Sequence, residues 1–407
     1  MRASSNPNLS GSESLEKIVA PLSTGDFLDR YWSKSFIHIP GNQSKFVGLL
    51  SWARLNEILA YHQFPPENLI LIKNGAHVPA EQYLQLNSLP RWLNAAEITN
   101  TLGDGATLIL DHVDSLDPNV RKFAVNLERA FRTSVWINMY AGWGTEAGFD
   151  LHWDNHHTMI LQVSGRKRWK VYKPTRLYPL KNDVEVARRP TEPPIWEGVL
   201  EQGGFLHIPR GWWHVAYPMG EPCMHLSVVV SDVSCTDLVR WLGNQLKTLE
   251  IARRGIPHLA KRDQRSSYLA EIWQAIQDEW TPDIIERYLS HLESAEPRRP
   301  EFNLPFAPAE NQQMLESDSI VKLATPFRLD LSGAPQGGVI WFKTFGKTWR
   351  CPEVVIPALR ALNDGESHRV DELRGYAGDE SGSFEIQSFL CALVLEGAVV
   401  RQERGSE

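Results

Sequence analysis

The sequence predicts a mixed α and β protein built around a small antiparallel double-sheet barrel, because its hydrophobic pattern changes along the chain. Residues 25–131 mix short helical and strand signals, residues 134–231 carry short runs typical of strands, and from residue 236 the apolar spacing is helical. A chain of 407 residues is too long for one ordinary core. We therefore expect two or three domains.

The N-terminal part mixes both kinds of element. Residues 1–20 are rich in serine and asparagine and lack the apolar stretch of a signal peptide, so we expect residues 1–24 to form a mobile tail. The following residues predict helices at 26–34, 51–62 and 117–131 and strands at 35–41 and 68–75. The helix at 117–131 has one apolar face, formed by Val120, Phe123, Ala124, Leu127 and Phe131.

The middle of the chain predicts the barrel. Its strand-like runs are rich in Val, Ile, Trp and Tyr and are broken by Gly or Pro: 134–142, 148–165, 167–174, 203–209 and 223–231. Short strands closed by such turns are typical of a double-sheet barrel of the jelly-roll or cupin kind. We expect it to form the core of a domain spanning residues 25–235.

A helical block is expected at residues 236–297. Thr236 is the predicted cap of its first helix, a second helix carries apolar residues from Tyr268 to Ile276, and Thr281-Pro282 predicts the start of a third. The apolar faces of these helices exceed what the barrel alone covers. They therefore predict a homodimer interface.

The last part of the chain, residues 306–407, follows a proline-rich linker. It predicts strand, three helices and strand, an order that resembles a winged helix. The segment holds ten Lys or Arg and fifteen Asp or Glu, a net charge of −5. A DNA-binding domain should be basic on its docking face, so a protein-binding or architectural module is favoured.

Composition and charge exclude several classes of protein. The net charge of −7 argues against non-specific binding to nucleic acid or to anionic membranes, and no apolar run is long enough to span a bilayer. The four cysteines are scattered without a C-x-x-C pair, which predicts a reducing, cytoplasmic location. A phosphate-binding glycine-rich loop and a G-x-S-x-G motif are both missing.

The strongest chemical signal is His152-Trp-Asp154, with His214 further along the chain. In a β-strand, side chains i and i+2 point to the same face, so His152 and Asp154 should converge. Two histidines and one carboxylate on one face of a metal leave its other positions open, as non-haem Fe(II) oxygenases require. A fortuitous triplet in a surface strand is the alternative, and the Gly/Pro-bounded strand–turn–strand around His214 favours the metal.

Lys167 is the next candidate. In the run Arg166-Lys167-Arg168-Trp169, alternation places Lys167 and Trp169 on one face and the arginines on the other. A lysine that points into a barrel is costly unless it meets an anion, and a dicarboxylate co-substrate would supply one. The alternative is a turn with solvated basic residues.

The other titratable residues of this region have ordinary interpretations. His156 or His157 could reach the mouth of a pocket, and a role as a fourth metal ligand is disfavoured because a co-substrate or oxygen needs that position. His207 is interpreted as a residue of the core or of the rim. Asp232 and the pair Arg188-Arg189 are interpreted as solvated surface.

Together these motifs resemble the JmjC-domain 2-oxoglutarate oxygenases, most closely the ribosomal-oxygenase-like branch, whose members hydroxylate protein side chains. The resemblance rests on His152-Trp-Asp154-x-x-x-Thr158, Lys167, Ile208-Pro209-Arg210-Gly-Trp-Trp-His214, and the N-terminal signature Tyr31-Trp32-Ser-Lys34 with Phe36-Ile-His-Ile-Pro40. A helical dimerisation block and a winged-helix-like end are also the architecture of this branch.

The resemblance implies roles for individual residues. His152, Asp154 and His214 would bind Fe(II), and Lys167 would pair with the distal carboxylate of 2-oxoglutarate. The remaining pocket residues implied to contact co-substrate or substrate are Asn138, Tyr140, Thr158 and Ser227.

The implied function is hydroxylation of a protein or peptide side chain, with a ribosomal protein as one candidate, by Fe(II) and 2-oxoglutarate. Demethylation of N-methyl-lysine and oxygenation of RNA or of a small metabolite are alternatives with the same chemistry. A non-catalytic metal-binding cupin adaptor is an alternative of a different class. Lys167 discriminates against it, since an adaptor has little use for an inward lysine.

Overall fold

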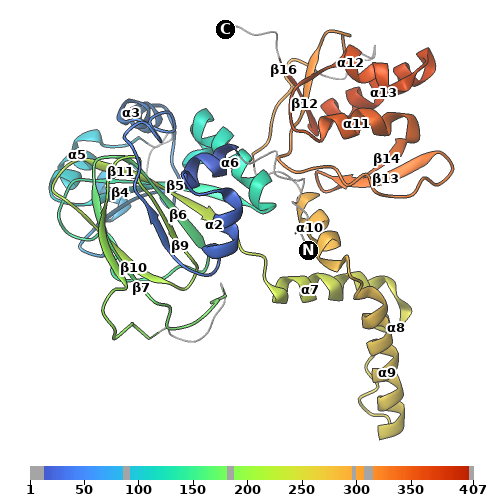
Figure 1. The fold of residues 1–407 in the computed structure, drawn as a ribbon, viewed down its shortest axis with the longest axis horizontal. Helices are drawn as coiled ribbons and strands as arrows, with labels where there is room; N and C mark the ends of the chain where they lie inside the picture. The colour runs from blue at the N-terminus through green and yellow to red at the C-terminus, as the bar shows by residue number, and fades with distance from the viewer. Residues whose placement is uncertain (1–12, 86–91, 181–187, 296–298, 307–314, 403–407) are drawn as a thin grey trace. The chain divides into compact units, whose positions relative to one another are not determined.

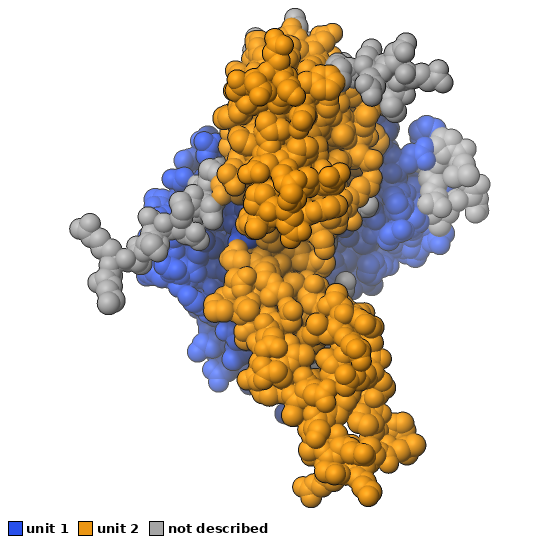
Figure 2. Space-filling view, turned by 90° about the vertical axis from the view of Figure 1, so that its right-hand side faces the viewer, with its two compact units in different colours: residues 1–232 blue, residues 233–407 orange. Residues whose placement is uncertain are grey.

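The chain folds into two compact units. The computed structural model describes residues 13–85, 92–180, 188–295, 299–306 and 315–402. Unit 1 comprises residues 1–232 and unit 2 residues 233–407, coloured blue and orange in Figure 2. Figure 1 labels many of their helices and strands. Each unit is described by itself below.

Unit 1 holds a β-rich fold with helices before and between its strands. Its described helices are α1 (Glu13–Val19), α2 (Thr24–Arg30), α3 (Trp52–Tyr61), α4 (Ala80–Tyr83), α5 (Ala95–Gly103) and α6 (Pro118–Phe131). Its described strands are β1 (Ile37–Ile39), β2 (Leu69–Lys73), β3 (Ala76–His77), β4 (Thr107–Leu110), β5 (Val135–Gly142), β6 (His157–Ser164), β7 (Lys167–Tyr172), β8 (Trp196–Leu200), β9 (Phe205–Ile208), β10 (Trp213–Pro218) and β11 (Cys223–Val230).

The strands of unit 1 form two antiparallel sheets, which confirms the predicted double-sheet fold. The larger sheet has the order β1-β9-β6-β11-β5-β4-β2-β3, and the smaller sheet has the order β10-β7-β8. Strands distant in sequence are neighbours in the larger sheet, because β11 pairs with both β5 and β6. This topology brings residues from both ends of the strand-rich region onto one face.

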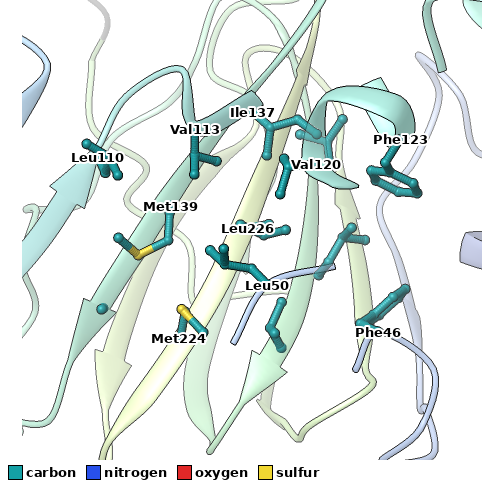
Figure 3. Close-up of a cluster of buried hydrophobic side chains, with 14 of the residues drawn as sticks. Phe46, Leu50, Leu110, Val113, Val120, Phe123, Ile137, Met139, Met224 and Leu226 are labelled. Atoms are coloured by element: carbon teal, nitrogen blue, oxygen red, sulfur yellow. The ribbon is translucent and has the colours of Figure 1, made fainter. Parts of the chain in front are cut away.

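Alternation along β5 and β11 separates a core face from a second face. Val135, Ile137 and Met139 of β5 are buried with the apolar residues of α6 and belong to one hydrophobic cluster. Figure 3 shows part of this cluster, with Val120 of α6 near the middle and Leu226 of β11 below it. Because side chains alternate along a strand, the residues between them, such as Asn138, face the opposite side.

The predicted N-terminal tail is wrong for the residues from Glu13 onward. Residues 13–19 form α1, in which Leu15, Ile18 and Val19 are fully buried. These residues join the core cluster, and Ser14 accepts a hydrogen bond from Asn126 of α6. The serine-rich composition concealed this short apolar face. Residues 1–12 lie outside the described part of the chain.

Unit 2 begins with helices and ends in a small α/β arrangement. Its described helices are α7 (Cys235–Gln245), α8 (Glu250–Arg253), α9 (Arg262–Glu279), α10 (Ile284–Glu293), α11 (Ile356–Leu362), α12 (Val370–Arg374) and α13 (Glu380–Leu395). Its described strands are β12 (Ile320–Leu323), β13 (Val339–Thr344), β14 (Lys347–Pro352), β15 (His368–Arg369) and β16 (Val399–Gln402).

Two predicted helix caps in unit 2 are each wrong by two residues. The cap of α7 is Ser234, not Thr236, because Ser234 and Asp237 form a reciprocal capping box. Helix α10 begins after Asp283, so Thr281-Pro282 precedes the helix instead of opening it. The predicted helices and strands of residues 339–402 are found, whereas β12, β14 and β15 were missed. The winged-helix likeness of this part stays a prediction.

Among the residues that the structure describes, no helix has the length and apolar character needed to cross a membrane.

Candidate active site

A cavity of about 230 Å³ lies in unit 1 and is lined by strands of both sheets. Strands β5, β6 and β11 contribute from the larger sheet, and β7 and β10 from the smaller one. All the pocket residues named from the sequence line this cavity: Asn138, Tyr140, His152, Asp154, Thr158, Lys167, His214 and Ser227. The fold therefore brings them to one place.

His152, Asp154 and His214 form a cluster at this cavity. One potential ligand atom from each of the three lies within 4.8 Å of the others, and Nε2 of His214 is 3.5 Å from Oδ2 of Asp154. The two imidazole rings have centroids 4.4 Å apart. Two imidazoles and a carboxylate at this spacing form the donor set of a facial triad.

The local structure of the triad differs from the predicted strand. The expected strand 148–165 is observed only as β6, from His157 to Ser164, so His152 and Asp154 precede it. Residue 152 instead forms an isolated bridge with residue 214, in which each backbone N–H donates to the other residue's carbonyl oxygen, at 3.2 and 2.7 Å. Strand alternation is therefore not what makes His152 and Asp154 converge. The bridge to residue 214 holds His152, and the backbone N–H of Gly211 donates to the carbonyl oxygen of Asp154.

Hydrogen bonds of the histidine rings fix which nitrogen is available. Nδ1 of His152 lies 2.7 Å from the carbonyl oxygen of Asp150, and Nδ1 of His214 lies 3.1 Å from that of Trp212. A carbonyl oxygen only accepts, so each Nδ1 carries the proton and each Nε2 presents a lone pair. Such bonds orient metal-binding histidines in proteins.

The carboxylate of the cluster is held in its ionised form. Burial would raise the pKa of Asp154, but His214, His156 and His152 together with a hydrogen bond from Thr158 lower it below its ordinary value. The Thr158 hydroxyl donates to Oδ2 of Asp154 at 3.3 Å. The site therefore offers a charged oxygen donor at neutral pH.

The pKa of His214 is lowered by burial from 6.5 to about 4, with His152 contributing. Between these values the unfolded chain binds a proton at this position and the folded chain does not, so protons favour unfolding. The contribution of neutral His214 to the free energy of unfolding is therefore complete above pH 6.5. It falls as the pH drops from 6.5 and is lost once the pH has passed 4. We expect the unfolding midpoint of the metal-free protein to fall between pH 6.5 and 4, and His214→Gln to reduce that fall.

Thermal unfolding followed by circular dichroism across this pH range measures both curves. Burial also lowers the pKa of His207 and His225, and both remain in the variant. The difference between the two proteins therefore reports His214 together with Asp154, whose pKa His214 lowers. Parallel curves would contradict the assignment.

Lys167 lies on the inward face of β7, as the alternation predicts. Lys167 and Trp169 are buried, whereas Arg168 between them is exposed. The Lys167 side chain is 4% exposed, burial lowers its pKa, and within the described part of the chain no carboxylate lies within ion-pair distance of it. A buried ammonium without a counter-charge is unfavourable, so this end of the cavity fits an anion.

Polar residues of β5 and β11 line the opposite wall. Asn138 pairs in register with Ser227, and Tyr140 pairs with His225. Burial, followed by the negative charges of Asp154 and Asp111, raises the pKa of Tyr140, so its hydroxyl keeps its proton. This wall offers an amide and two hydroxyl groups that can donate or accept hydrogen bonds.

Some cavity residues were not assigned a role from the sequence. His225 stacks flat on Tyr140, with ring centroids 4.8 Å apart, and lies edge-on to Trp169 at 5.6 Å. Its alternation with Ser227 in the run 223–231 was the signal that could have identified it. Thr107 and Phe149 also line the cavity, and nothing in their local sequence marks them.

The remaining sequence interpretations have mixed outcomes. His156 lines the cavity, and His207 is fully buried, as the core interpretation requires. Arg188 and Arg189 are exposed. The interpretation of Asp232 as solvated surface is wrong, because Oδ2 of Asp232 lies 3.1 Å from Nε of Arg210 and 3.4 Å from Nε2 of His157.

Part of the chain is similar to a known family of domains. Residues 114–238 match the family model described as JmjC domain. A bifunctional lysine-specific demethylase and histidyl-hydroxylase NO66 from Drosophila mojavensis is 26% identical over 311 residues, which cover 70% of this chain and 33% of that protein. Ribosomal oxygenase 1 from Homo sapiens is 27% identical over 210 residues, covering 49% of this chain and 31% of that protein. The chain thus matches about a third of the length of these relatives.

Solved structures show the same fold. The crystal structure of the Escherichia coli ribosomal oxygenase YcfD aligns with a TM-score of 0.58 and 19% identity, covering 94% of this chain and 98% of that chain. A structure of YcfD in complex with cobalt and 2-oxoglutarate aligns with a TM-score of 0.59 and 17% identity, covering 94% and 99% of the two chains. The overall arrangement of elements is therefore shared with a ribosomal oxygenase.

Proposed function

We propose that this chain, which carries a JmjC domain, is an Fe(II)- and 2-oxoglutarate-dependent oxygenase that hydroxylates a side chain of a protein or peptide. The observation that carries the proposal is the placement of a buried ammonium, Lys167, in the same cavity as the cluster of His152, Asp154 and His214. The described residues bring no carboxylate to this ammonium. A metal-binding adaptor needs the cluster alone. A cation in the same cavity is what a dicarboxylate co-substrate requires.

The residues present fit both groups. The three side chains offer two imidazole nitrogens and one carboxylate oxygen, which is the donor set that non-haem Fe(II) enzymes use. Lys167 would hold the distal carboxylate of 2-oxoglutarate. When bound, the iron supplies the redox chemistry that couples oxidation of a substrate C–H bond to C–OH with conversion of 2-oxoglutarate and oxygen to succinate and carbon dioxide.

The chain's own residues supply position and environment. Thr158 holds the Asp154 carboxylate, and the backbone pairing of His152 with His214 holds the two rings. Trp169 and Tyr140 form aromatic walls of the cavity, which limit the access of water. Asn138 and Ser227 are placed to orient the co-substrate or the substrate by hydrogen bonds.

A protein substrate is supported by the names of the relatives, which are ribosomal oxygenases and a histidyl-hydroxylase. The test is incubation of the chain with Fe(II), 2-oxoglutarate and a ribosomal protein fraction, followed by mass spectrometry. The expected result is an added oxygen atom on a defined peptide together with stoichiometric succinate. Unmodified peptides in every fraction, with succinate no higher than without protein, would refute the proposal.

We also propose that the chain is a homodimer through helix α9. None of the eighteen residues of α9 is buried, and Leu269 and Trp273 are 64% and 60% exposed. Large apolar side chains exposed on one helix favour association with another surface. A second copy of α9 is the simplest partner, because one self-complementary patch closes a two-fold dimer.

The dimer proposal predicts the effect of charge on α9. The variant Leu269→Glu with Trp273→Glu should sediment as a monomer at micromolar concentration, where the unmodified chain sediments as a dimer. Gln274→Glu adds a charge to the same helix and serves as the control that should stay dimeric. A wild-type monomer at the same concentration would exclude this interface.

The division of the chain into domains is also a proposal. We propose a catalytic domain that ends near residue 235, a helical block to residue 297 and a winged-helix-like domain from residue 306. The net charge of −5 over residues 306–407 supports protein binding over nucleic-acid binding by that domain. The four cysteines are unpaired, which supports a location in a reducing cytoplasm.

A further inference from the structure

A charged network borders the metal-ligand cluster without taking part in it. Asp232 lies two residues after the end of strand β11, and its Oδ2 contacts both Arg210 and His157. His157 is the first residue of β6 and is 1% exposed, and its Nε2 lies 2.9 Å from the hydroxyl of Ser33. The network therefore joins four separate segments of unit 1.

The composition of this network suggests a hydrolytic triad, but its geometry excludes one. Both Ser33 and Asp232 approach the same nitrogen, Nε2 of His157. In a Ser-His-Asp triad the acid and the nucleophile use different ring nitrogens. Nδ1 of His157 is buried without a hydrogen-bond partner. The contacts of this network therefore position its side chains and do not form a hydrolytic triad.

The N-terminal signature packs onto the same histidine. The ring of Trp32 lies 4.2 Å from that of His157 and 5.2 Å from that of His207, and it stacks on Phe131 at 4.5 Å. Ser33 has a left-handed backbone, with φ of 57°, which presents its hydroxyl to the histidine. The Tyr31–Lys34 motif therefore supports the start of β6.

The turn between β9 and β10 connects this network to the ligands. Arg210 lies in that turn, and the next residue, Gly211, donates its backbone N–H to the carbonyl oxygen of Asp154 at 2.8 Å. Gly211 has φ of +82°, and a Cβ there would lie 2.7 Å from Pro179, so the turn has little freedom to change. His214 follows at the start of β10.

We propose that Asp232 and Arg210 are positioning residues that fix the Pro209–Trp212 turn and thereby hold Asp154 and His214 at the spacing that the metal needs. The inference rests on the proposed function for the presence of the metal. Neither Asp154 nor His152 lies in a regular strand, so their placement depends on the hydrogen bonds from this turn and from His214. Loss of the Asp232–Arg210 contact releases the turn and weakens metal binding.

The test measures Co(II) affinity of the full chain by isothermal titration calorimetry, without co-substrate. Asp232→Asn and Arg210→Gln should each weaken binding roughly 10-fold or more, the usual effect of removing a residue that supports a metal ligand. The double variant should weaken binding by less than the two single effects combined, because the Asp232–Arg210 contact is lost in both single variants. Asp104→Asn, which removes an exposed ion pair with Lys73 in the same unit, should bind Co(II) as the unmodified chain does.

The unfolding midpoint is measured in parallel, and Arg210→Lys provides a milder change should the other variants fail to fold. It keeps the positive charge but loses the planar guanidinium, so it should also weaken Co(II) binding. Unchanged Co(II) affinity in folded Asp232→Asn, with or without a lower midpoint, would overturn the positioning role alone. Failure of the unmodified chain to bind Co(II) would overturn the proposed function as well.

Discussion

Replacing His152 by alanine is expected to lower substrate-coupled succinate formation more than about 100-fold. Even residues that only support a metal ligand contribute roughly 10- to 100-fold, and His152 presents its own Nε2 to the site. Asp154→Ala should have an effect at least as large, because it removes the negative charge of the cluster. Steady-state succinate assays with saturating Fe(II) measure the loss.

The matched control is His77→Ala, since His77 is an exposed histidine of β3 in the same unit. Its succinate formation should equal that of the unmodified chain. Circular dichroism establishes that each variant is folded. Undiminished turnover in folded His152→Ala would remove the metal cluster from the mechanism.

Replacing Lys167 by methionine is expected to weaken 2-oxoglutarate binding. The same change is expected to stabilise the fold of the protein when no 2-oxoglutarate is bound. Truncating one partner of a buried charge pair costs about 2–5 kcal/mol, so the KM for 2-oxoglutarate should rise at least about 30-fold. Without the co-substrate the ammonium is buried and the described residues place no carboxylate beside it, so the apolar side chain should add about 1–3 kcal/mol to the free energy of unfolding.

A higher KM for 2-oxoglutarate together with a higher free energy of unfolding would identify Lys167 as the anchor of the co-substrate. Arg168→Met is the control, because Arg168 is the exposed neighbour on β7 and should change neither quantity appreciably. Burial lowers the pKa of Lys167, so just below the ordinary lysine pKa of 10.5 the unfolded chain binds more protons at this residue than the folded chain does. The free energy of unfolding therefore rises with pH in that window. The variant should lose this rise. An unchanged KM for 2-oxoglutarate in Lys167→Met would refute the anchor.

Strand alternation is the part of the site that sequence reasoning predicts well. In β7 the pattern of Lys167, Arg168 and Trp169 is observed as predicted, because every second residue of a strand shares a face irrespective of its neighbours. The same rule places Asn138 and Tyr140 on the cavity side of β5. These assignments depend on a few adjacent residues and on no distant contact.

Elements whose structure depends on distant partners were missed or misplaced. The composition of α1 predicts a tail, because its short apolar face is buried only when it packs in the core beside α6. The composition around His152 predicts a strand, although the backbone of His152 pairs with residue 214 at a single position. The local pattern at Asp232 predicts solvated surface, because no local signal reveals Arg210 and His157 beside it.

The amino-acid sequence by itself determined which chemical groups this protein could bring to a site: two histidines and a carboxylate, one inward lysine, and the alternating strands that present them. Only the tertiary structure decided how the two histidines meet, which ring nitrogens stay free, and that Asp232 ties the ligand-bearing turn to the strands around it. The reason is physical. The face on which a strand residue lies follows from backbone geometry within a few residues, whereas the backbone pairing of residues 152 and 214 and the contacts of Asp232 join segments that become neighbours only when the sheets have formed.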